Sequence, residues 1–179
     1  MYQFKIHQIK NPDDQYYAEF WRVYTLSFPL NERRISVQQS EIFNKSGYHL
    51  QTFISDKQFI GFISFWRAKD FIFIEHLAIA PEFRNQGLGK TILKSFIEGK
   101  LIPIILEIEF PVDKITRNRL RFYESLNFKM NYHNHYQPAY HAEDEPISMK
   151  ILSYPMVINN FNFQKFVSFE DEIVTGKTN

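Results

Sequence analysis

Three strand-like segments follow one another in the middle of the chain, and this run constrains the fold more than any other feature. Residues 48–54 and 59–66 are rich in β-branched and aromatic side chains. Ser55-Asp56-Lys57 separates them, which predicts a hairpin. Residues 71–80 form a third segment of this kind, and Pro81 ends it. Because successive strands joined by short turns pair in antiparallel fashion, the run predicts a largely antiparallel sheet.

Helices and further strands are expected on both sides of this run. Asn11 and Pro12 predict the start of the first helix, as a capping residue and a first helical position. The periodicity predicts further strands over residues 2–8, 102–110, 128–135 and 147–152, and helices over residues 11–28, 36–45, 88–99, 116–126 and 161–174. This order predicts an α/β fold with one mixed, largely antiparallel sheet of about six to seven strands and helices on both faces.

Composition limits the class of protein. The 179 residues fit one domain, which we expect to span residues 1–154, with a helical C-terminal extension over residues 155–179. A net charge of +1 provides no broad basic field, which argues against a nucleic-acid partner. The chain has no cysteine, so disulfides, cysteine-ligated zinc and a cysteine nucleophile are excluded.

The same composition bears on location. The N-terminus has no signal-peptide pattern, and no apolar stretch approaches the ~20 residues of a membrane span. We therefore expect a soluble, cytoplasmic protein without a membrane partner. The surplus of aromatic residues and the C-terminal extension make a homodimer a reasonable expectation.

Gly87 and Gly89 lie between the third strand of the run and the next helix. Glycines let backbone N–H groups approach a ligand without a Cβ in the way. The start of a helix adds unpaired N–H donors and the positive end of the helix dipole. Together these features predict an anion site suited to phosphate. The alternative is a tight turn that uses glycine only for its dihedral angles.

Two phosphate-binding motifs fail at this turn. Gly89-Lys90-Thr91 ends like a nucleotide P-loop, but Arg84 stands where that motif needs its first glycine. The dinucleotide-binding pattern needs a glycine at the position of Ile92. A P-loop NTPase is therefore the least favoured alternative.

A third motif fits. The segment HLAIAPEFRNQGLGKTIL, residues 76–93, has R-x-x-G-x-G after an apolar strand and resembles the acetyl-CoA signature of the GNAT acetyltransferase superfamily. The element order agrees from Ile72 to Phe128, where FYESLNF resembles the family's helix tyrosine and closing Gly-Phe, with Asn127 replacing the glycine. Thr116 stands where asparagine is frequent and is expected to cap its helix. Arg119 replaces a small residue and could either bind a phosphate or narrow the CoA groove.

The resemblance implies an N-acetyltransferase that uses acetyl-CoA as co-substrate and a primary amine of a small molecule or peptide as acceptor. It also implies which residues contact the cofactor. These are Leu77, Ala78, Ile79, Arg84, Asn85, Gln86, Gly87, Leu88, Gly89, Lys90, Asn118, Arg119 and Tyr123. A non-catalytic acyl-CoA-binding module that senses or regulates is the main alternative.

Catalytic roles fall on three residues. By resemblance, Tyr123 is the acid, since a phenol with a pKa of ~10 can donate a proton to a leaving thiolate. Glu75 is the candidate base, because by strand parity it is the only charge on a face shared with Phe71, Phe73, Leu77 and Ile79. A salt bridge to Arg67 or Lys69 is the alternative, and His76 is expected on the opposite face, packed under a helix. Without cysteine, direct attack in a ternary complex is favoured.

Glu107 and Glu109 share a face of the next strand and could attract a cationic amine or relay its proton, with Glu107 as the catalytic candidate. A solvated face is the alternative.

Glu32 resembles an acidic residue on the family's acceptor side, although Arg33 and Arg34 allow a surface ion cluster instead. Tyr136 and Tyr140, in a loop where family members shape the acceptor pocket, are expected to contact substrate. His133, His135 and His141 lack an acidic partner at a characteristic spacing. We therefore expect exposed or structural roles for them and no metal.

Overall fold

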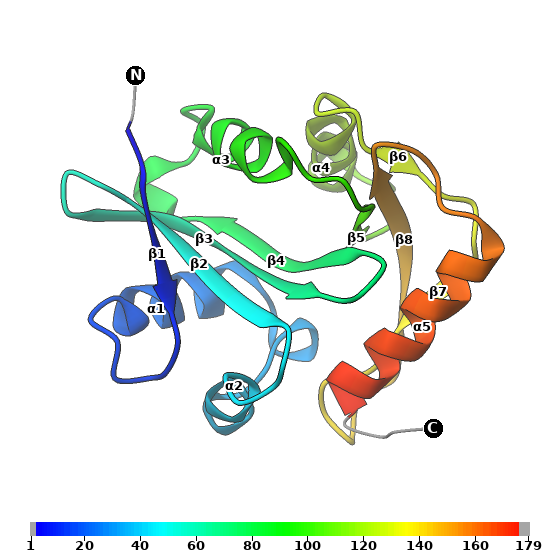
Figure 1. Ribbon diagram of the computed structural model, residues 1–179, viewed down its shortest axis with the longest axis horizontal. Helices are drawn as coiled ribbons and strands as arrows, with labels where there is room; N and C mark the ends of the chain where they lie inside the picture. Colours follow the sequence, from blue (N-terminus) through cyan, green and yellow to red (C-terminus); the bar gives the residue numbers. More distant parts are fainter. Residues whose placement is uncertain (1–2, 176–179) are drawn as a thin grey trace. The chain divides into compact units, whose positions relative to one another are not determined.

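The computed structural model describes residues 3–175 (Figure 1). It divides after Lys100 into two compact units. Tyr2 and residues 176–179, which the expected first strand and C-terminal extension include, lie outside the described residues. The domain boundary expected at Pro155 stays a prediction.

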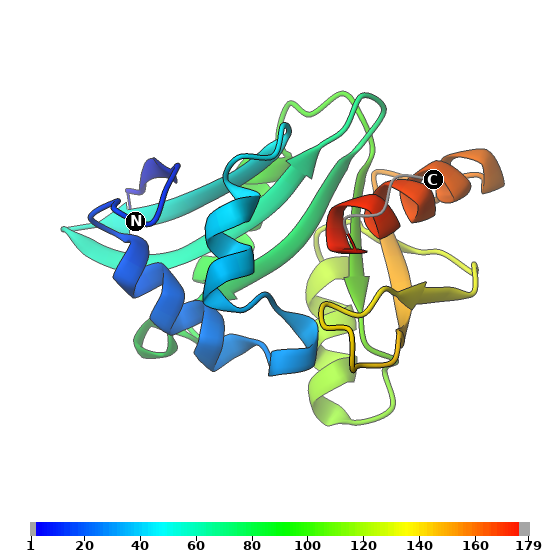
Figure 2. The same cartoon turned by 90° about the horizontal axis from the view of Figure 1, so that it is seen from below.

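The first unit is built on an antiparallel sheet of four strands. In spatial order these are β1 (Lys5–Ile9), β2 (Tyr48–Ser55), β3 (Gln58–Arg67) and β4 (Ile72–Ile79). Helices α1 (Tyr17–Ser27) and α2 (Ser36–Ile42) cover one face, and α3 (Leu88–Ile97) covers the other (Figures 1 and 2). Short 3₁₀ turns follow α1 at Leu30–Glu32 and β4 at Pro81–Phe83.

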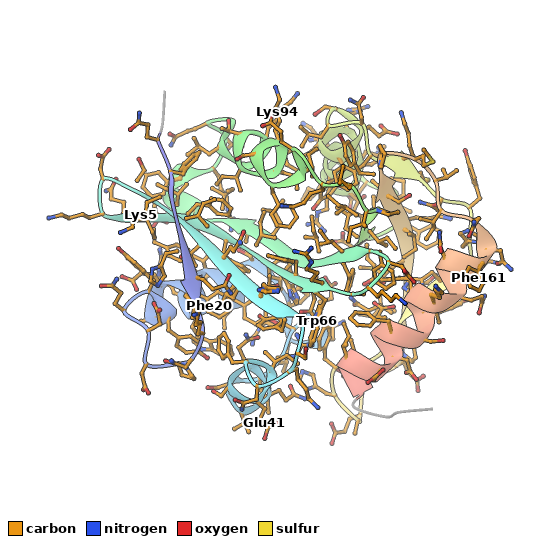
Figure 3. All side chains as sticks on the ribbon, in the orientation of Figure 1. Lys5, Phe20, Glu41, Trp66, Lys94 and Phe161 are labelled. Atoms are coloured by element: carbon orange, nitrogen blue, oxygen red, sulfur yellow. The ribbon has the colours of Figure 1, made fainter. Side chains whose placement is uncertain are left out.

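Aromatic rings pack both faces of this sheet. Phe62 and Phe65 stand three residues apart in β3, so their side chains point to opposite faces. Phe62 packs edge-on against Phe20 of α1, with ring centroids 4.8 Å apart, and Phe65 packs against Phe96 of α3 at 4.9 Å. Phe20 and Trp66, both labelled in Figure 3, are among the largest fully buried side chains. Phenylalanine side chains therefore form a large part of the core of this unit.

A β-bulge interrupts the pairing of β3 with β4. Ser64 lies opposite His76 and Phe65 lies opposite Ile74, so Glu75 is the additional residue on β4. A bulge reverses the alternation of side chains beyond it. Glu75 and His76 therefore share the face covered by α1 and α2, and Leu77 lies on the other. The expectation that Glu75 and His76 lie on opposite faces is wrong, because it assumed an uninterrupted strand.

The second unit is centred on β8 (Ile147–Tyr154). It pairs antiparallel with β5 (Ile104–Ile108), β6 (Lys129–Met130) and β7 (His135–Gln137). Helix α4 (Lys114–Glu124) contacts β5, and α5 (Asn160–Thr175) packs against β7. In total, the described residues form eight strands, because the one expected over residues 128–135 is split into β6 and β7.

Asn131 accounts for that split. Its Nδ2 donates to Ser153 Oγ at 2.9 Å, and its Oδ1 accepts from the backbone N–H of Ile158 at 2.9 Å. The side chain is buried and joins the chain after β6 to β8 and to the segment before α5. A polar side chain with this many local partners competes with a regular strand ladder.

Two helix starts differ from expectation. Asn11 Oδ1 accepts from the N–H of Asp13, and Asp14 Oδ1 accepts from that of Tyr16, both at 2.9 Å, so residues 11–16 form turns and α1 begins at Tyr17. Asp113, not Thr116, caps α4, and Thr116 completes the capping box at the third helical position.

The expected fold class is confirmed, as an α/β fold with largely antiparallel strands and helices on both sheet faces. None of the helices between residues 3 and 175 is long and apolar enough to cross a lipid bilayer.

Candidate functional site

The glycine turn after β4 is exposed and open. Asn85 and Gly87 both have positive φ, 62° and 74°, and Gly87 is the N-cap of α3. A Cβ placed on Gly87 would meet nothing within 4 Å. The N–H groups of Leu88, Gly89 and Lys90 open the helix and have no acceptor within it. The turn is thus exposed at the start of a helix, and the anion binding that the sequence predicts for it stays a prediction.

Arg84 fixes this turn to its surroundings. Its Nε donates to the carbonyl of Ile79 at 2.9 Å, and its Nη2 donates to Ser27 Oγ at 2.9 Å. An ion pair between Arg22 and Glu82, 2.6 Å long, links α1 to the same segment. Arg84 thus supports the end of β4 and the start of the turn, while its expected contact with the cofactor stays a prediction.

Glu75 forms a buried ion pair with Arg34. Glu75 Oε1 lies 2.7 Å from Arg34 Nη1, and Trp66 Nε1 donates to Glu75 Oε2 at 3.2 Å. The Glu75 side chain has no exposed surface, and that of Arg34 is 4% exposed. The salt bridge considered as the alternative role of Glu75 is present, but its partner is Arg34 and not Arg67 or Lys69, because the bulge turns Glu75 toward the segment after α1. Arg34 is likewise no part of a surface ion cluster.

His76 is packed as expected. Its ring lies edge-on to Tyr24 and Phe28, at centroid distances of 4.9 and 4.5 Å. Its Nδ1 is 3.3 Å from Ser64 Oγ, and its Nε2 is 3.0 Å from the carbonyl oxygen of Glu32. His76 therefore anchors the backbone at Glu32, the residue expected on the acceptor side.

Tyr123 of α4 is buried in the second unit. Its ring lies edge-on to Phe128, with centroids 5.7 Å apart. Burial raises the pKa of Tyr123 to about 12, with a smaller lowering by Arg119 and a smaller raising by Glu109. The phenol is therefore protonated at neutral pH, as a proton donor must be.

Arg119 and Glu109 pair with each other. Arg119 Nη1 contacts Glu109 Oε2, joining α4 to the residue that follows β5, and both side chains are partly exposed. On the same helix, Arg121 Nη1 donates to Asn118 Oδ1 at 3.4 Å. Arg119 is thus paired with Glu109, the residue that the sequence predicts to attract the acceptor amine. A contact of Arg119 with a phosphate of CoA must compete with this ion pair.

Four polar residues converge in the second unit. His135 Nε2 lies 2.5 Å from Glu107 Oε1 and 3.1 Å from Glu170 Oε2. Gln137 Nε2 donates to Glu107 Oε2 at 3.0 Å. Side-chain exposure is 4% for Glu107 and 1% for His135 and Glu170. This cluster joins β5, β7 and α5.

The cluster corrects two sequence interpretations. Glu107 does not lie on a solvated face. His135 does have acidic partners, although they lie far from it in the chain. Glu170 was not predicted from the sequence. One signal was available, because Glu170 stands four residues after Phe166 and seven after Phe163 on the apolar stripe of α5. A charge on such a stripe needs a partner.

The two tyrosines expected to contact substrate differ in exposure. Tyr136 is 63% exposed and Tyr140 is 4% exposed. A surface contact is thus open to Tyr136, whereas Tyr140 is packed inside the protein. Both assignments stay predictions.

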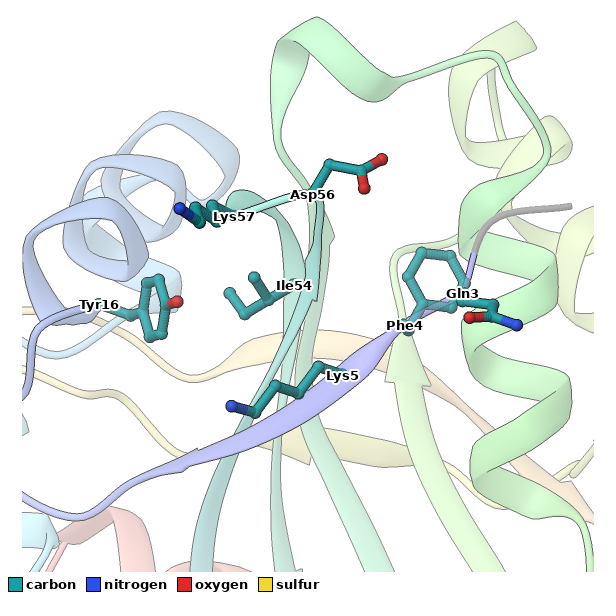
Figure 4. Close-up of a pocket in the computed structure, with 7 residues that line it drawn as sticks. All are labelled: Gln3, Phe4, Lys5, Tyr16, Ile54, Asp56 and Lys57. Carbon is teal, nitrogen blue, oxygen red and sulfur yellow. The ribbon is translucent and has the colours of Figure 1, made fainter.

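A shallow pocket of about 380 Å³ lies beside β1 (Figure 4). Its lining residues are Gln3, Phe4, Lys5, Tyr16, Ile54, Asp56 and Lys57. None of them belongs to the predicted site, so this pocket is not the candidate active site.

Comparison with known families agrees with this architecture. Residues 47–130 match the family described as an acetyltransferase (GNAT) domain. That range includes β2, β3, β4, the glycine turn, α3, β5 and α4. The chain therefore contains a GNAT acetyltransferase domain, and the expected resemblance is confirmed.

Among individual proteins, the chain is similar to YjbC of Bacillus subtilis, which is classed by name with the acetyltransferases, at 31% identity over 130 residues. That match covers 70% of this chain and 64% of the relative, so less than two thirds of YjbC is spanned. A solved structure from Bacteroides thetaiotaomicron, assigned to the GNAT family, has a TM-score of 0.89 and 28% identity, covering 97% of this chain and 99% of that one.

A GNAT family acetyltransferase from Elizabethkingia anophelis, solved with acetyl-CoA bound, has a TM-score of 0.58 and 15% identity. The match covers 84% of this chain and 96% of that one. At this identity, it shows a shared fold.

Proposed function

We propose that this protein is an N-acetyltransferase that moves an acetyl group from acetyl-CoA to a primary amine. The observation that carries the proposal is the open turn at Gly87, which stands at the start of α3 within the range that matches a GNAT domain and resembles the family's acetyl-CoA signature. The presence of acetyl-CoA in the Elizabethkingia anophelis structure supports the choice of cofactor.

In the proposed reaction, the amine nitrogen attacks the thioester carbonyl in a ternary complex. A C–N bond forms and the C–S bond breaks, so the CoA sulfur leaves as a thiolate. Tyr123 donates its phenolic proton to that thiolate. Its raised pKa keeps this proton on the phenol at neutral pH until the thiolate forms. The amine loses a proton to a carboxylate, and the chain offers Glu75 and Glu107 for this step.

The two carboxylates differ in their surroundings. Glu75 is bonded to Arg34 and Trp66 and must weaken those contacts to accept a proton. Glu107 contacts His135, an imidazole that can receive the proton in turn. Glu75→Gln and Glu107→Gln should therefore be compared by their pH–rate profiles. The variant that loses the acidic limb of the profile identifies the base.

The direct test incubates the full chain with acetyl-CoA and a panel of small amines and peptides, and follows the release of free CoA thiol. Amine-dependent thiol release is expected. If acetyl-CoA binds but no amine promotes release, the second candidate function, a non-catalytic acyl-CoA-binding module, is favoured. The engagement of Glu75 with Arg34 is the observation that favours this second candidate. Calorimetry with ATP serves as the control for the P-loop alternative, which requires ATP binding that depends on Lys90.

A further inference from the structure

We propose that Glu107, His135 and Glu170 form a binding site for a divalent transition-metal ion such as Zn²⁺ or Mn²⁺. The sequence predicts no metal site, because these residues are scattered along the chain. In the folded second unit, one ligand atom from each lies within 4.8 Å of the other two. This inference does not depend on acetyl transfer.

The strand register places three polar residues on one face of the sheet. Glu107 of β5 lies opposite Ile151 of β8, and His135 of β7 lies opposite Met149. Ile151 and Met149 are two residues apart in β8, so they share a face, and Glu107 and His135 share it with them. Gln137, two residues after His135, lies on that face as well.

Helix α5 brings the second carboxylate to the same face. Phe163 and Phe166 of α5 pack against the His135 ring, with centroid distances of 6.0 and 5.6 Å. Glu170 is one helical turn beyond Phe166, so it follows these rings along the same stripe. Packing of two aromatic residues thus fixes the Glu170 carboxylate next to Nε2 of the imidazole.

Both carboxylates approach the same nitrogen atom. Nε2 of His135 is 2.5 Å from Glu107 Oε1 and 3.1 Å from Glu170 Oε2. This nitrogen carries at most one proton, so the two carboxylates can only share a single N–H, which weakens its bond to each of them. A metal ion bound to Nε2 can take both oxygens as ligands, because one ion binds several donor atoms at once.

Gln137 provides a separate indication of a ligand. The residue is 6% exposed, and its amide reaches the cluster through the bond from Nε2 to Glu107 Oε2. Its Oε1 is buried without a hydrogen-bond partner. A buried amide oxygen of this kind is costly unless it is satisfied. Rotation of the amide would let Oε1 bind the ion or accept a hydrogen bond from a metal-bound water.

The donor set defines the class of ion. One imidazole nitrogen with carboxylate and amide oxygens suits Zn²⁺, Mn²⁺ and neighbouring transition metals better than soft ions that prefer sulfur. Ligand bonds of about 2.0–2.2 Å place two donors on one ion roughly 3–4 Å apart, so small side-chain movements suffice. In the tautomer with the proton on Nε2, the ion displaces that proton and releases it to solvent. While the ion is bound, Glu107 is not available as the base of the proposed reaction.

The test uses the untagged full chain, stripped with a chelator and incubated separately with Zn²⁺ and Mn²⁺. After gel filtration, retained metal is measured by mass spectrometry. The wild type is expected to keep about one equivalent of at least one metal. Glu170→Gln should lose most of it, and Glu172→Gln, a matched change at an exposed position of α5, should keep it.

Retention of less than about a tenth of an equivalent by folded wild type with both metals overturns the proposal, as does equal retention by Glu170→Gln. If Glu170→Gln does not fold, the visible spectrum of the wild type with Co²⁺ decides. Absorption bands of a protein-bound ion that Zn²⁺ removes support the site, and a spectrum equal to that of Co²⁺ in buffer overturns it.

Discussion

Tyr123 is the residue with the most specific proposed role. Replacing it with phenylalanine removes the proton donor but keeps the ring that packs against Phe128. Turnover should fall by roughly 10²-fold or more, because general acid catalysis contributes at that scale. Affinity for acetyl-CoA, measured by calorimetry, should change little. An unchanged turnover number would remove Tyr123 from the mechanism.

The raised pKa of Tyr123 also has a consequence for stability. Its ordinary value is 10.0, and burial raises it to about 12 in the folded protein. The contribution of Tyr123 to the free energy of unfolding is therefore fully present below pH 10. It is lost as the pH rises toward 12, because Tyr123 ionises first in the unfolded chain. Buried Tyr24 and Tyr48, whose pKa values are also raised by burial, act in the same direction.

We therefore expect the free energy of unfolding, measured with urea, to decline above pH 10. The decline should be smaller in Tyr123→Phe. An equal decline in both proteins would show that Tyr123 ionises as easily in the folded protein as in the unfolded one.

The ion pair between Arg34 and Glu75 gives a prediction on stability that is independent of catalysis. Arg34→Leu leaves a buried carboxylate without its guanidinium, so the free energy of unfolding should fall by about 3–5 kcal/mol. Adding Glu75→Gln to the same chain should recover part of this loss. Urea unfolding of the two single variants and the double variant measures both effects. Additive losses would mean that the two side chains are not coupled.

Individual residues also show where sequence reasoning succeeds. The exposed turn at Gly87 could be predicted, because its chemistry depends on neighbours in the chain and on the start of one helix. The environment of Glu75 could not, because the bulge depends on pairing with β3. The cluster around His135 could not either, since register and helix packing bring its members together from three elements.

At the scale of elements, helix α3 offers a matched pair of glycines. Gly87 precedes it with φ of 74° and Gly99 follows it with φ of 70°, and a Cβ on either would meet nothing within 4 Å. Valine should strain the backbone similarly at both positions. Only Gly87→Val should weaken CoA binding, by about tenfold or more, because only this turn is proposed to hold the diphosphate. Calorimetric titration of both variants with CoA distinguishes backbone strain from a lost binding site. Equal CoA affinities of the two variants would contradict the assignment of the diphosphate to the turn at Gly87.

The pairing of β3 with β4 depends on Gly61. A Cβ at this position would lie 2.4 Å from the carbonyl oxygen of Ala78. Gly61→Ala should therefore lower the free energy of unfolding by about 1–3 kcal/mol, since the strands must move apart. Urea unfolding measures the loss. A variant as stable as the wild type would show that β4 shifts without cost at this point.

At the scale of the molecule, the order of strands and helices was predictable, because hydrophobic periodicity and turn residues are local signals. The expected class and the GNAT resemblance are both confirmed. Element boundaries were less accurate where polar side chains intervene, as at Asn11 and Asn131. Both form hydrogen bonds whose partners the periodicity does not reveal.

A crystal structure of the full chain with CoA shows whether the turn at Gly87 holds the cofactor. We expect the diphosphate within hydrogen-bond distance of backbone N–H groups between Asn85 and Lys90, with the pantetheine arm running along β4. CoA bound elsewhere on the protein, with this turn left without a ligand, would disprove the proposed role of the turn.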